Sequence, residues 1–408
     1  MSRVLRPLRL ARGKLLSLGA GLLFLTLTHN AAAQGRTLSL KEAVQLAQQQ
    51  NFELRSTAKE VDVAKSRVAG ASVLLKDNPV LAISVGPRTN VSGRSLDYGA
   101  QLTQQIEIAG QRGARIDAAE SSLRASNAQL AATRAVITAR VRTQFGRTLA
   151  MAERVRLAEE ALVIVREGKT AAEERLRAGA ATQLELNTAD VEQGRALRLR
   201  SEAQGAYAEA LAELQFLVGL DPSQPVTPVG ELKTGTAEAA GAPTNLIQHA
   251  IAARPELQEA KAAADSAKAE EQLASREWVP SPRIGASVNR EEESRTTIIQ
   301  GILSIDVPVF NRNAGPRGIT KARTQQALTR LSATEHRIKQ DVVRALARLQ
   351  AARAAVDGYT SSVVSAMQQN MELVVESYRA GKIDFLQLIV IRRQVVDARA
   401  EYIDVLEE

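Results

Sequence analysis

Apolar and polar residues alternate over two short regions of the chain. In the first region the apolar face consists of Leu81, Ile83, Val85, Leu96, Tyr98, Ala100 and Leu102. In the second region it consists of Ile284, Ala286, Val288, Leu303, Ile305 and Val307. A period of two predicts β-strands with one apolar and one polar face. Each region is therefore expected to form a β-hairpin, with strands at about residues 79–105 and 282–309.

The remaining apolar positions recur with helical spacing. From Leu331 to Val363 they alternate steps of four and three residues, which is the heptad pattern of a coiled coil. The segment from about Arg112 to Arg177 contains no helix breaker stronger than a glycine and predicts one helix of ~100 Å at ~1.5 Å per residue. A shorter helix before each β-hairpin is predicted to break near Asn51 and near Arg254. Helices this long must pack along one another, so we expect long antiparallel coiled-coil helices.

One sequence motif occurs twice, about 200 residues apart, and marks an internal two-fold repeat. RLRAGAATQLEL begins at Arg175, and SYRAGKIDFLQL begins at Ser377. In each copy the glycine is predicted to end the long helix in a left-handed conformation, with the arginine in the last helical turn. The motif thus marks the tip of a helical hairpin.

The repeat divides residues 34–408 into three parts. Residues 34–220 form the first repeat with its tip near residue 179, and residues 244–408 form the second with its tip near residue 381. Residues 221–243 contain three prolines and read as a linker. Residue 408 corresponds to residue 206 of the first copy, whose helix continues to Leu220, so the repeat predicts closure of the last helical hairpin less firmly than closure of the first.

The N-terminal segment has the pattern of an export signal. Arginines and a lysine precede an apolar run from Leu15 to Leu27, and Ala31-Ala32-Ala33 follows. We expect a signal peptide at residues 1–33, because the apolar run is shorter than the roughly 20 residues of a membrane-spanning helix. Much of the formal net charge of +8 lies in this segment, so the basic balance does not indicate a nucleic-acid partner. No later segment is apolar enough for a transmembrane helix, and membrane insertion would have to use strands.

Composition gives no support for an enzyme. The 408 residues include no cysteine and only 3% aromatic residues, which is typical of long helices. After the predicted signal peptide the histidines are His249 and His336, on separate helical segments, and no nucleophile elbow, phosphate loop or zinc-binding motif occurs. We therefore expect no catalytic residues, no cofactor and no metal site.

The order of these elements resembles the TolC family of outer-membrane efflux proteins. Two segments that lead into long helices, residues 105–112 (QIEIAGQR) and 307–315 (VPVFNRNAG), resemble the CzcC-like branch of that family, which serves heavy-metal efflux. The resemblance implies a mainly α protein with a small β part, in which a homotrimer shares a twelve-stranded β-barrel in the outer membrane of a Gram-negative bacterium. The helices would continue as a tunnel in the periplasm. The four strands predicted per chain are too few to close a barrel alone, and an open sheet edge is not viable in lipid, so a barrel shared between chains agrees with the strand count. One departure is that the barrel interfaces lack the usual aromatic girdle, with only Tyr98 in the hairpins and Trp278 and Phe310 beside them.

The function implied is a passive exit duct of a tripartite efflux system. It would dock to a periplasmic adaptor and an inner-membrane RND pump and export heavy-metal cations. A drug-efflux or type I secretion duct of the same architecture is an alternative. A periplasmic coiled-coil adaptor or scaffold is a second one, although the apolar faces of two β-hairpins would have no role there.

Two groups of residues are candidates for this function. Arg177, Gly179, Arg379 and Gly381 are expected to cap helices, and we expect the exposed tips they form to dock the adaptor as well. Glu372, Glu376 and Asp384 could form a threefold acidic ring that narrows the tunnel entrance, as in cation-selective pores. The alternative for these three residues is an ordinary solvated helix face.

Overall fold

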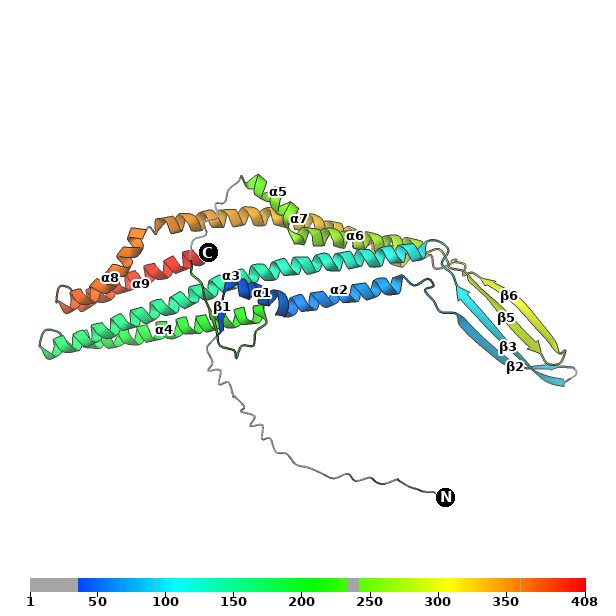
Figure 1. Ribbon diagram of the computed structural model, residues 1–408, viewed down its shortest axis with the longest axis horizontal. Coiled ribbons are helices and arrows are strands. Elements are labelled where there is room, and N and C mark those ends of the chain that lie inside the picture. The colour runs from blue at the N-terminus through cyan, green and yellow to red at the C-terminus, as the bar shows by residue number, and fades with distance from the viewer. Residues whose placement is uncertain (1–35, 92, 233–241, 360) are drawn as a thin grey trace, which may run out of the picture.

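The molecule is long and narrow, with helices along most of its length and a small β-sheet beyond one end (Figure 1). The computed structural model describes residues 36–91, 93–232, 242–359 and 361–408. The predicted signal peptide, residues 1–33, lies outside the described residues. Within the described ranges, no helix combines the length and the apolar character needed to cross a membrane.

The first half of the chain is organised around one helix that runs nearly the whole length of the helical part. Its helices are α1 (Leu40–Gln50), α2 (Phe52–Ala71), α3 (Gln111–Arg177) and α4 (Gln183–Val218). The 67 residues of α3 form one uninterrupted helix of roughly 100 Å at ~1.5 Å per residue, which confirms the prediction. Helix α2 packs along the half of α3 nearer the sheet and α4 along the other half (Figure 1). The break between α1 and α2 falls at Asn51, as predicted, and the Asn51 side chain caps α2 by accepting from the Leu54 N–H.

The second half repeats this arrangement with one important difference. Its helices are α5 (Pro243–Ala253), α6 (Pro255–Arg276), α7 (Ala314–Gly358), α8 (Ser361–Arg379) and α9 (Phe385–Glu407). The prediction of a continuous heptad seam up to Val363 is wrong, because α7 ends at Gly358 and α8 begins in a new direction (Figure 1). Tyr359 leaves the helical conformation with φ −91° and ψ 70°, and its ring lies 5.1 Å from that of Tyr402 on α9. Glycine weakens the helix at this point, and the tyrosine pair stabilises the bend.

Four antiparallel strands form the sheet beyond the helices. They are β2 (Val80–Asn90), β3 (Gly93–Gln105), β5 (Arg283–Glu291) and β6 (Thr296–Ser304), in the spatial order β2-β3-β5-β6. The central pairing joins β3 of the first repeat to β5 of the second, so the two predicted hairpins form one continuous sheet.

A short parallel pair of strands, absent from the sequence-based expectations, lies near the middle of the molecule. Strand β1 (Arg36–Leu38) pairs with β4 (Val226–Pro228). Leu38 and Val226 are buried in a cluster with residues of α1, α3 and α4. The beginning of the region read as a linker is therefore folded onto the helices.

Candidate functional site

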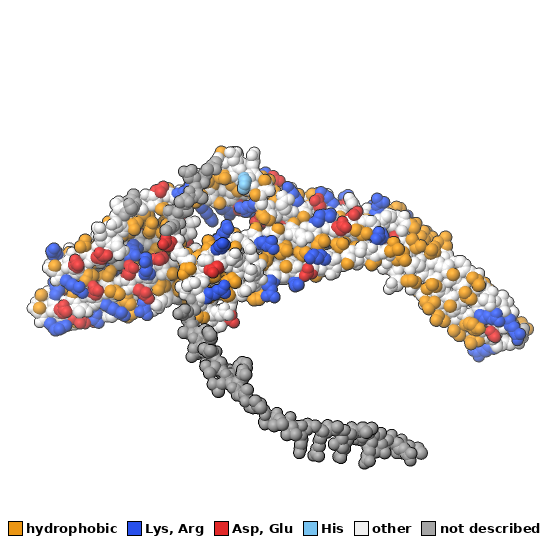
Figure 2. Space-filling view, in the orientation of Figure 1, with side chains coloured by type: hydrophobic (Ala, Val, Ile, Leu, Met, Phe, Trp, Pro, Cys, Tyr) orange, Lys and Arg blue, Asp and Glu red, His pale blue; other side chains and the backbone are white. Residues whose placement is uncertain are grey.

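One face of the sheet is apolar and exposed. The register places Leu81 opposite Leu102, and Leu102 opposite Ala286. Along each strand the same face carries the alternating apolar residues, and hydrophobic side chains cover the middle of the sheet in the space-filling view (Figure 2). The side chains of Ile83 and Leu303 are 73% and 75% exposed. An exposed apolar face of this kind marks a surface that contacts either lipid or another protein chain.

The opposite face of the sheet carries a cluster of charged residues. Arg88 on β2 donates to Asp97 on β3 and to Glu291 on β5, with 2.7 Å for each nitrogen–oxygen distance. This arrangement ties both repeats together near the hairpin turns. One arginine meets two carboxylates, so the cluster carries one net negative charge.

Close approach of β3 and β5 depends on two glycines. A Cβ atom on Gly285 would lie 2.2 Å from the Leu102 carbonyl oxygen, and one on Gly99 would lie 2.2 Å from Oδ1 of Asn289. The outer edges of β2 and β6 have no partner strand within the described part of the chain. Because open edges are not viable in lipid, a sheet placed there must pair with other copies of the chain.

Both helical tips are closed by the glycines that the repeated motif predicts. Gly179 and Gly381 have φ values of +74° and +67°, which confirms the left-handed caps. Beyond the first glycine, the Ala180 N–H donates to the Arg175 carbonyl at 2.8 Å, and the Lys382 N–H makes the corresponding bond to Ser377 at 2.9 Å. These bonds, together with those of the glycine N–H groups, form Schellman motifs that satisfy the last carbonyls of α3 and α8.

The two candidate arginines at the tips are exposed but differ in their contacts. Arg379 on α8 forms an ion pair with Glu167 on α3 at 3.5 Å. Arg177 has no ion-pair partner in the described part of the chain. The three candidate acidic residues also lie near the second tip. Glu372 and Glu376 are exposed on α8, whereas Asp384 is the N-cap of α9, and its carboxylate accepts from the Gln387 N–H at 2.7 Å.

Sequence reasoning missed a buried cluster that joins the two helical hairpins at their tips. Tyr378 on α8 is fully buried, and its hydroxyl donates to the carboxylate of Glu185 on α4. The Arg175 guanidinium lies 4.9 Å from the centre of the Tyr378 ring, and the Phe385 ring meets the same ring edge-on at 5.6 Å. Burial, reinforced by the hydrogen bond to Glu185, raises the pKa of Tyr378 above its ordinary value. Tyr378 stands directly before the second Arg-Ala-Gly motif, but its partner on α4 is distant in sequence.

A buried ion pair connects the same hairpins farther from the tips. Arg392 on α9 donates to Glu192 on α4 at 3.0 Å, and the two side chains are 8% and 4% exposed. Arg195 and Arg393 also contact the Glu192 carboxylate. Burial lowers the pKa of Arg392 from its usual value, although the nearby Glu192 charge opposes that shift. These contacts hold the two hairpins in one register.

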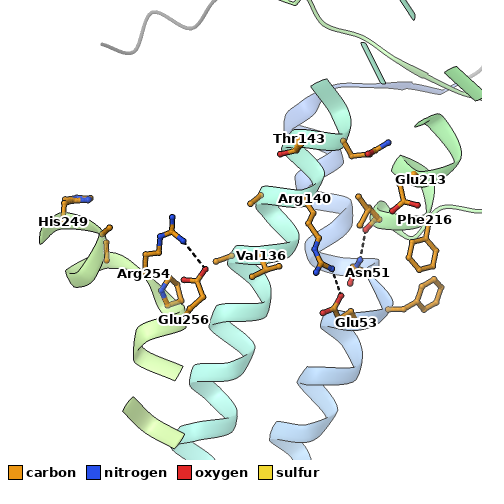
Figure 3. Close-up of a pocket in the computed structure, with 18 residues that line it drawn as sticks. Asn51, Glu53, Val136, Arg140, Thr143, Glu213, Phe216, His249, Arg254 and Glu256 are labelled. Atoms are coloured by element: carbon orange, nitrogen blue, oxygen red, sulfur yellow. Dashed lines mark hydrogen bonds and ion pairs between the residues drawn. The ribbon is translucent and has the colours of Figure 1, made fainter. Parts of the chain in front are cut away.

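A groove lies beside the middle of α3, where the α1–α2 and α5–α6 bends approach it (Figure 3). It has a volume of about 930 Å³. Arg140 of α3 pairs with Glu53 at 3.3 Å, and Asn51 donates to the Leu217 carbonyl at 2.9 Å. His249 lies at the outer edge on α5. Over the described ranges, no group of three or more His, Asp or Glu side chains is arranged to hold a metal ion.

The comparison with known proteins decides the family. The family model of the outer membrane efflux protein matches residues 43–220 and 246–408. The chain belongs to the outer membrane efflux protein family. It is 28% identical over 374 residues to the cobalt-zinc-cadmium resistance protein CzcC of Cupriavidus metallidurans, covering 90% of this chain and 86% of CzcC. It is 27% identical over 277 residues to the nickel-cobalt-cadmium resistance protein NccC of Alcaligenes xylosoxydans xylosoxydans, covering 66% of this chain and 62% of NccC.

Solved structures agree with the fold. The chain is similar to CusC with a TM-score of 0.71 at 19% identity, covering 94% of this chain and 92% of CusC. It is also similar to the CmeC outer membrane channel of Campylobacter jejuni, with a TM-score of 0.73 at 17% identity over 90% of this chain and 82% of that one.

Membership of the outer membrane efflux protein family establishes the location of the protein and its partners. The protein is a channel of the outer membrane and not an enzyme, with its helical part in the periplasm. The expectation of a homotrimer that works with a periplasmic adaptor and an inner-membrane RND pump is confirmed by the family. The exposed apolar face of the sheet is then the lipid-facing face, and the face with Arg88 lines the lumen.

Proposed function

We propose that this outer membrane efflux protein is the exit duct for divalent heavy-metal cations. The observation that carries the proposal is the similarity to CzcC, which extends over 90% of the chain. NccC and CnrC, whose names also state metal resistance, match long parts of the chain as well. The excess negative charge of the Arg88 cluster would favour cations at the lumen face of the barrel. Choice of the metal then rests with the pump, and the duct supplies passage.

The two tips are the proposed docking surface for the adaptor. Arg177, Gly179, Arg379 and Gly381 lie exposed at the end of the molecule opposite the sheet. Arg177 tests docking most directly. It is exposed and has no ion-pair partner in the described ranges, so replacing it breaks no ion pair within the chain. Substitution Arg177→Glu should weaken co-purification with the adaptor while the trimer persists. Arg166→Glu, exposed on the same helix about three turns earlier, is the matched control.

An acidic constriction at the tunnel entrance is proposed for Glu372 and Glu376, with Asp384 as a capping residue that adds charge. Glu372 and Glu376 are one helical turn apart, so they present charge on one side of α8. Replacing both glutamates with glutamine should reduce the preference for cations over anions in single-channel recordings. An unchanged reversal potential would leave them as a solvated helix face.

Growth of a deletion strain tests the substrate. The strain, with and without the restored gene, is grown across zinc, cobalt, cadmium, nickel and copper, and across a panel of hydrophobic drugs. Restored tolerance to metals alone supports the proposal. Restored tolerance to drugs alone refutes the metal cargo and leaves a drug-efflux duct, while loss of a secreted protein would indicate type I secretion.

A further inference from the structure

Several large apolar side chains are exposed where the sheet meets the helices. They belong to residues 73–75, 106–108, 278–280 and 305–310, which we call the junction segments. Phe310 is fully exposed, Leu74 is 77% exposed and Val307 is 73% exposed. Segments of this kind normally bury such residues or place them against a partner. The junction segments lie between the lipid-facing sheet and the periplasmic helices (Figure 1).

The apolar face of the sheet is too short to cross the membrane by itself. On β2 it extends from Leu81 to Pro87, which is about 20 Å of strand at ~3.3 Å per residue. With a barrel tilt of ~40°, this length projects to about 15 Å along the membrane normal, whereas the apolar band of a barrel is ~25 Å tall. The face is therefore about 10 Å short of that height.

The missing height cannot come from the end that carries the hairpin turns. Arg290 lies on the apolar side of the sheet, opposite Tyr98, and donates to Thr297 at 2.9 Å. Basic side chains gather at this end of the sheet in Figure 2. Charged residues therefore bound the apolar face there, and any extension must lie toward the helices.

The alternation of faces continues into the junction segments. After Leu303 on β6, Ile305 and Val307 occupy the next alternate positions, which continue the lipid-facing side of the strand. Asp306 lies between them on the other side and forms an ion pair with Arg283 of the lumen face at 3.6 Å. After β3 the same order appears, because Ile108 is exposed whereas Glu107 pairs with Arg115.

Several backbone and polar groups in and beside these segments have internal partners, although Oε1 of Gln104 and Oε2 of Glu107 have none among the described residues. The Ile106 N–H donates to the Pro282 carbonyl at 2.9 Å and extends the β3–β5 ladder, and the Val309 N–H donates to the Val307 carbonyl at 2.8 Å. Gln104 is a polar residue on the lipid-facing side, near the end of β3 that meets the helices. Its amide nitrogen donates to the carbonyls of Asp77 and Gln105, at 2.8 Å each. Pairing of this kind lowers the cost of entering lipid.

We propose that the junction segments insert into the periplasmic leaflet of the outer membrane and complete the apolar belt. Trp278 and Phe310 lie at the glycerol level of this leaflet and take the place of the sparse aromatic girdle. The partner is phospholipid, with acyl chains against Leu74, Val307 and Val309. This inference rests on the outer-membrane location of the sheet and not on the cargo, so the metal-tolerance assay and the test below can fail independently.

The chain provides its own depth probe, because its sequence contains a single tryptophan, Trp278. The full-length trimer is reconstituted into phosphatidylcholine vesicles whose lipids carry bromine either near the glycerol end or near the middle of the acyl chain. Bromine near the glycerol end should quench at least half of the Trp278 emission, and more than bromine at mid-chain. Acrylamide in the water should quench little. Emission that is insensitive to both lipids and open to acrylamide overturns the proposal.

A second tryptophan position tests the proposal independently of Trp278. Trp278→Phe combined with Phe310→Trp moves the probe to position 310, where the same shallow quenching is expected. The control is Trp278→Phe with Phe216→Trp, because Phe216 is an exposed phenylalanine beside the groove of Figure 3, far from the sheet. The proposal fails if the probe at 278 or at 310 responds to brominated lipid no more than the probe at 216. The unsubstituted protein already tests position 278, so misfolding of a variant does not remove the test.

Discussion

The contact between the two helical tips can be tested by removing one hydroxyl group. Tyr378→Phe deletes the hydrogen bond to the Glu185 carboxylate and keeps the buried ring against Arg175 and Phe385. Hydrogen bonds to charged groups contribute about 1.5–3 kcal/mol. Glu185 is half-buried, so water can replace part of the lost bond, and we expect a loss near the lower end of that range. A loss of about 1.4 kcal/mol changes an equilibrium tenfold.

Amide hydrogen exchange of the purified trimer is the assay. Amides in the last turns of α3 and α8 should exchange about tenfold faster in Tyr378→Phe, while amides of the sheet should be unchanged. The control is Tyr359→Phe, because the Tyr359 hydroxyl makes only a long 3.4 Å contact with Glu401. Equal exchange at the tips of Tyr378→Phe and the unsubstituted protein would refute the view that this bond holds the hairpins together.

Three further predictions concern pH, the buried ion pair and the sheet. Because the folded-state pKa of Tyr378 is raised, its stabilising effect is complete below its ordinary pKa of about 10 and is lost as pH rises through the folded-state value. The stability gap between the unsubstituted protein and Tyr378→Phe, measured by thermal unfolding, should therefore narrow only above about pH 10, and a constant gap would contradict this reasoning. Arg392→Ala should lower the free energy of unfolding by about 2 kcal/mol. This is less than the usual cost of breaking a buried ion pair, because the Glu192 carboxylate still forms ion pairs with Arg195 and Arg393. Arg393→Ala, at an exposed residue 3.6 Å from Glu192, should cost below about 0.5 kcal/mol in the same denaturation experiment, and equal losses would count against the buried pair. Gly285→Ala should abolish the heat-resistant trimer on gel electrophoresis, because the added Cβ would clash with the Leu102 carbonyl. The control Gly86→Ala should leave the trimer intact, since nothing lies within 4 Å of a Cβ at that position. An intact Gly285→Ala trimer would contradict the close approach of β3 and β5.

The sequence was informative wherever one local pattern decided the structure. Alternation from Leu81 to Leu102 predicted both faces of the first hairpin, because side chains of a strand point to alternate sides. The unbroken helical spacing of residues 112–177 predicted α3. Gly179 and Gly381 predicted helix ends, because a positive φ costs glycine little.

Long-range partners could not be predicted in this way. Nothing local to Tyr378 indicates Glu185, and nothing local to Glu192 indicates Arg392, because each pair forms only when the two hairpins pack together. Strand β4 was missed because three residues among prolines carry no periodic signal. The end of α7 at Gly358 was missed because the heptad pattern continues past it, while the Tyr359–Tyr402 contact comes from another helix.

The central claim is that metal cations leave the cell through this duct. The most direct measurement is the zinc and cobalt content of metal-loaded cells, followed over time by mass spectrometry in the deletion strain with and without the restored gene. The account predicts that the restored gene speeds the fall in both metals, and that the Arg177→Glu variant, if tip docking is correct, does not. Metal content that falls at the same rate with and without the gene would contradict the account.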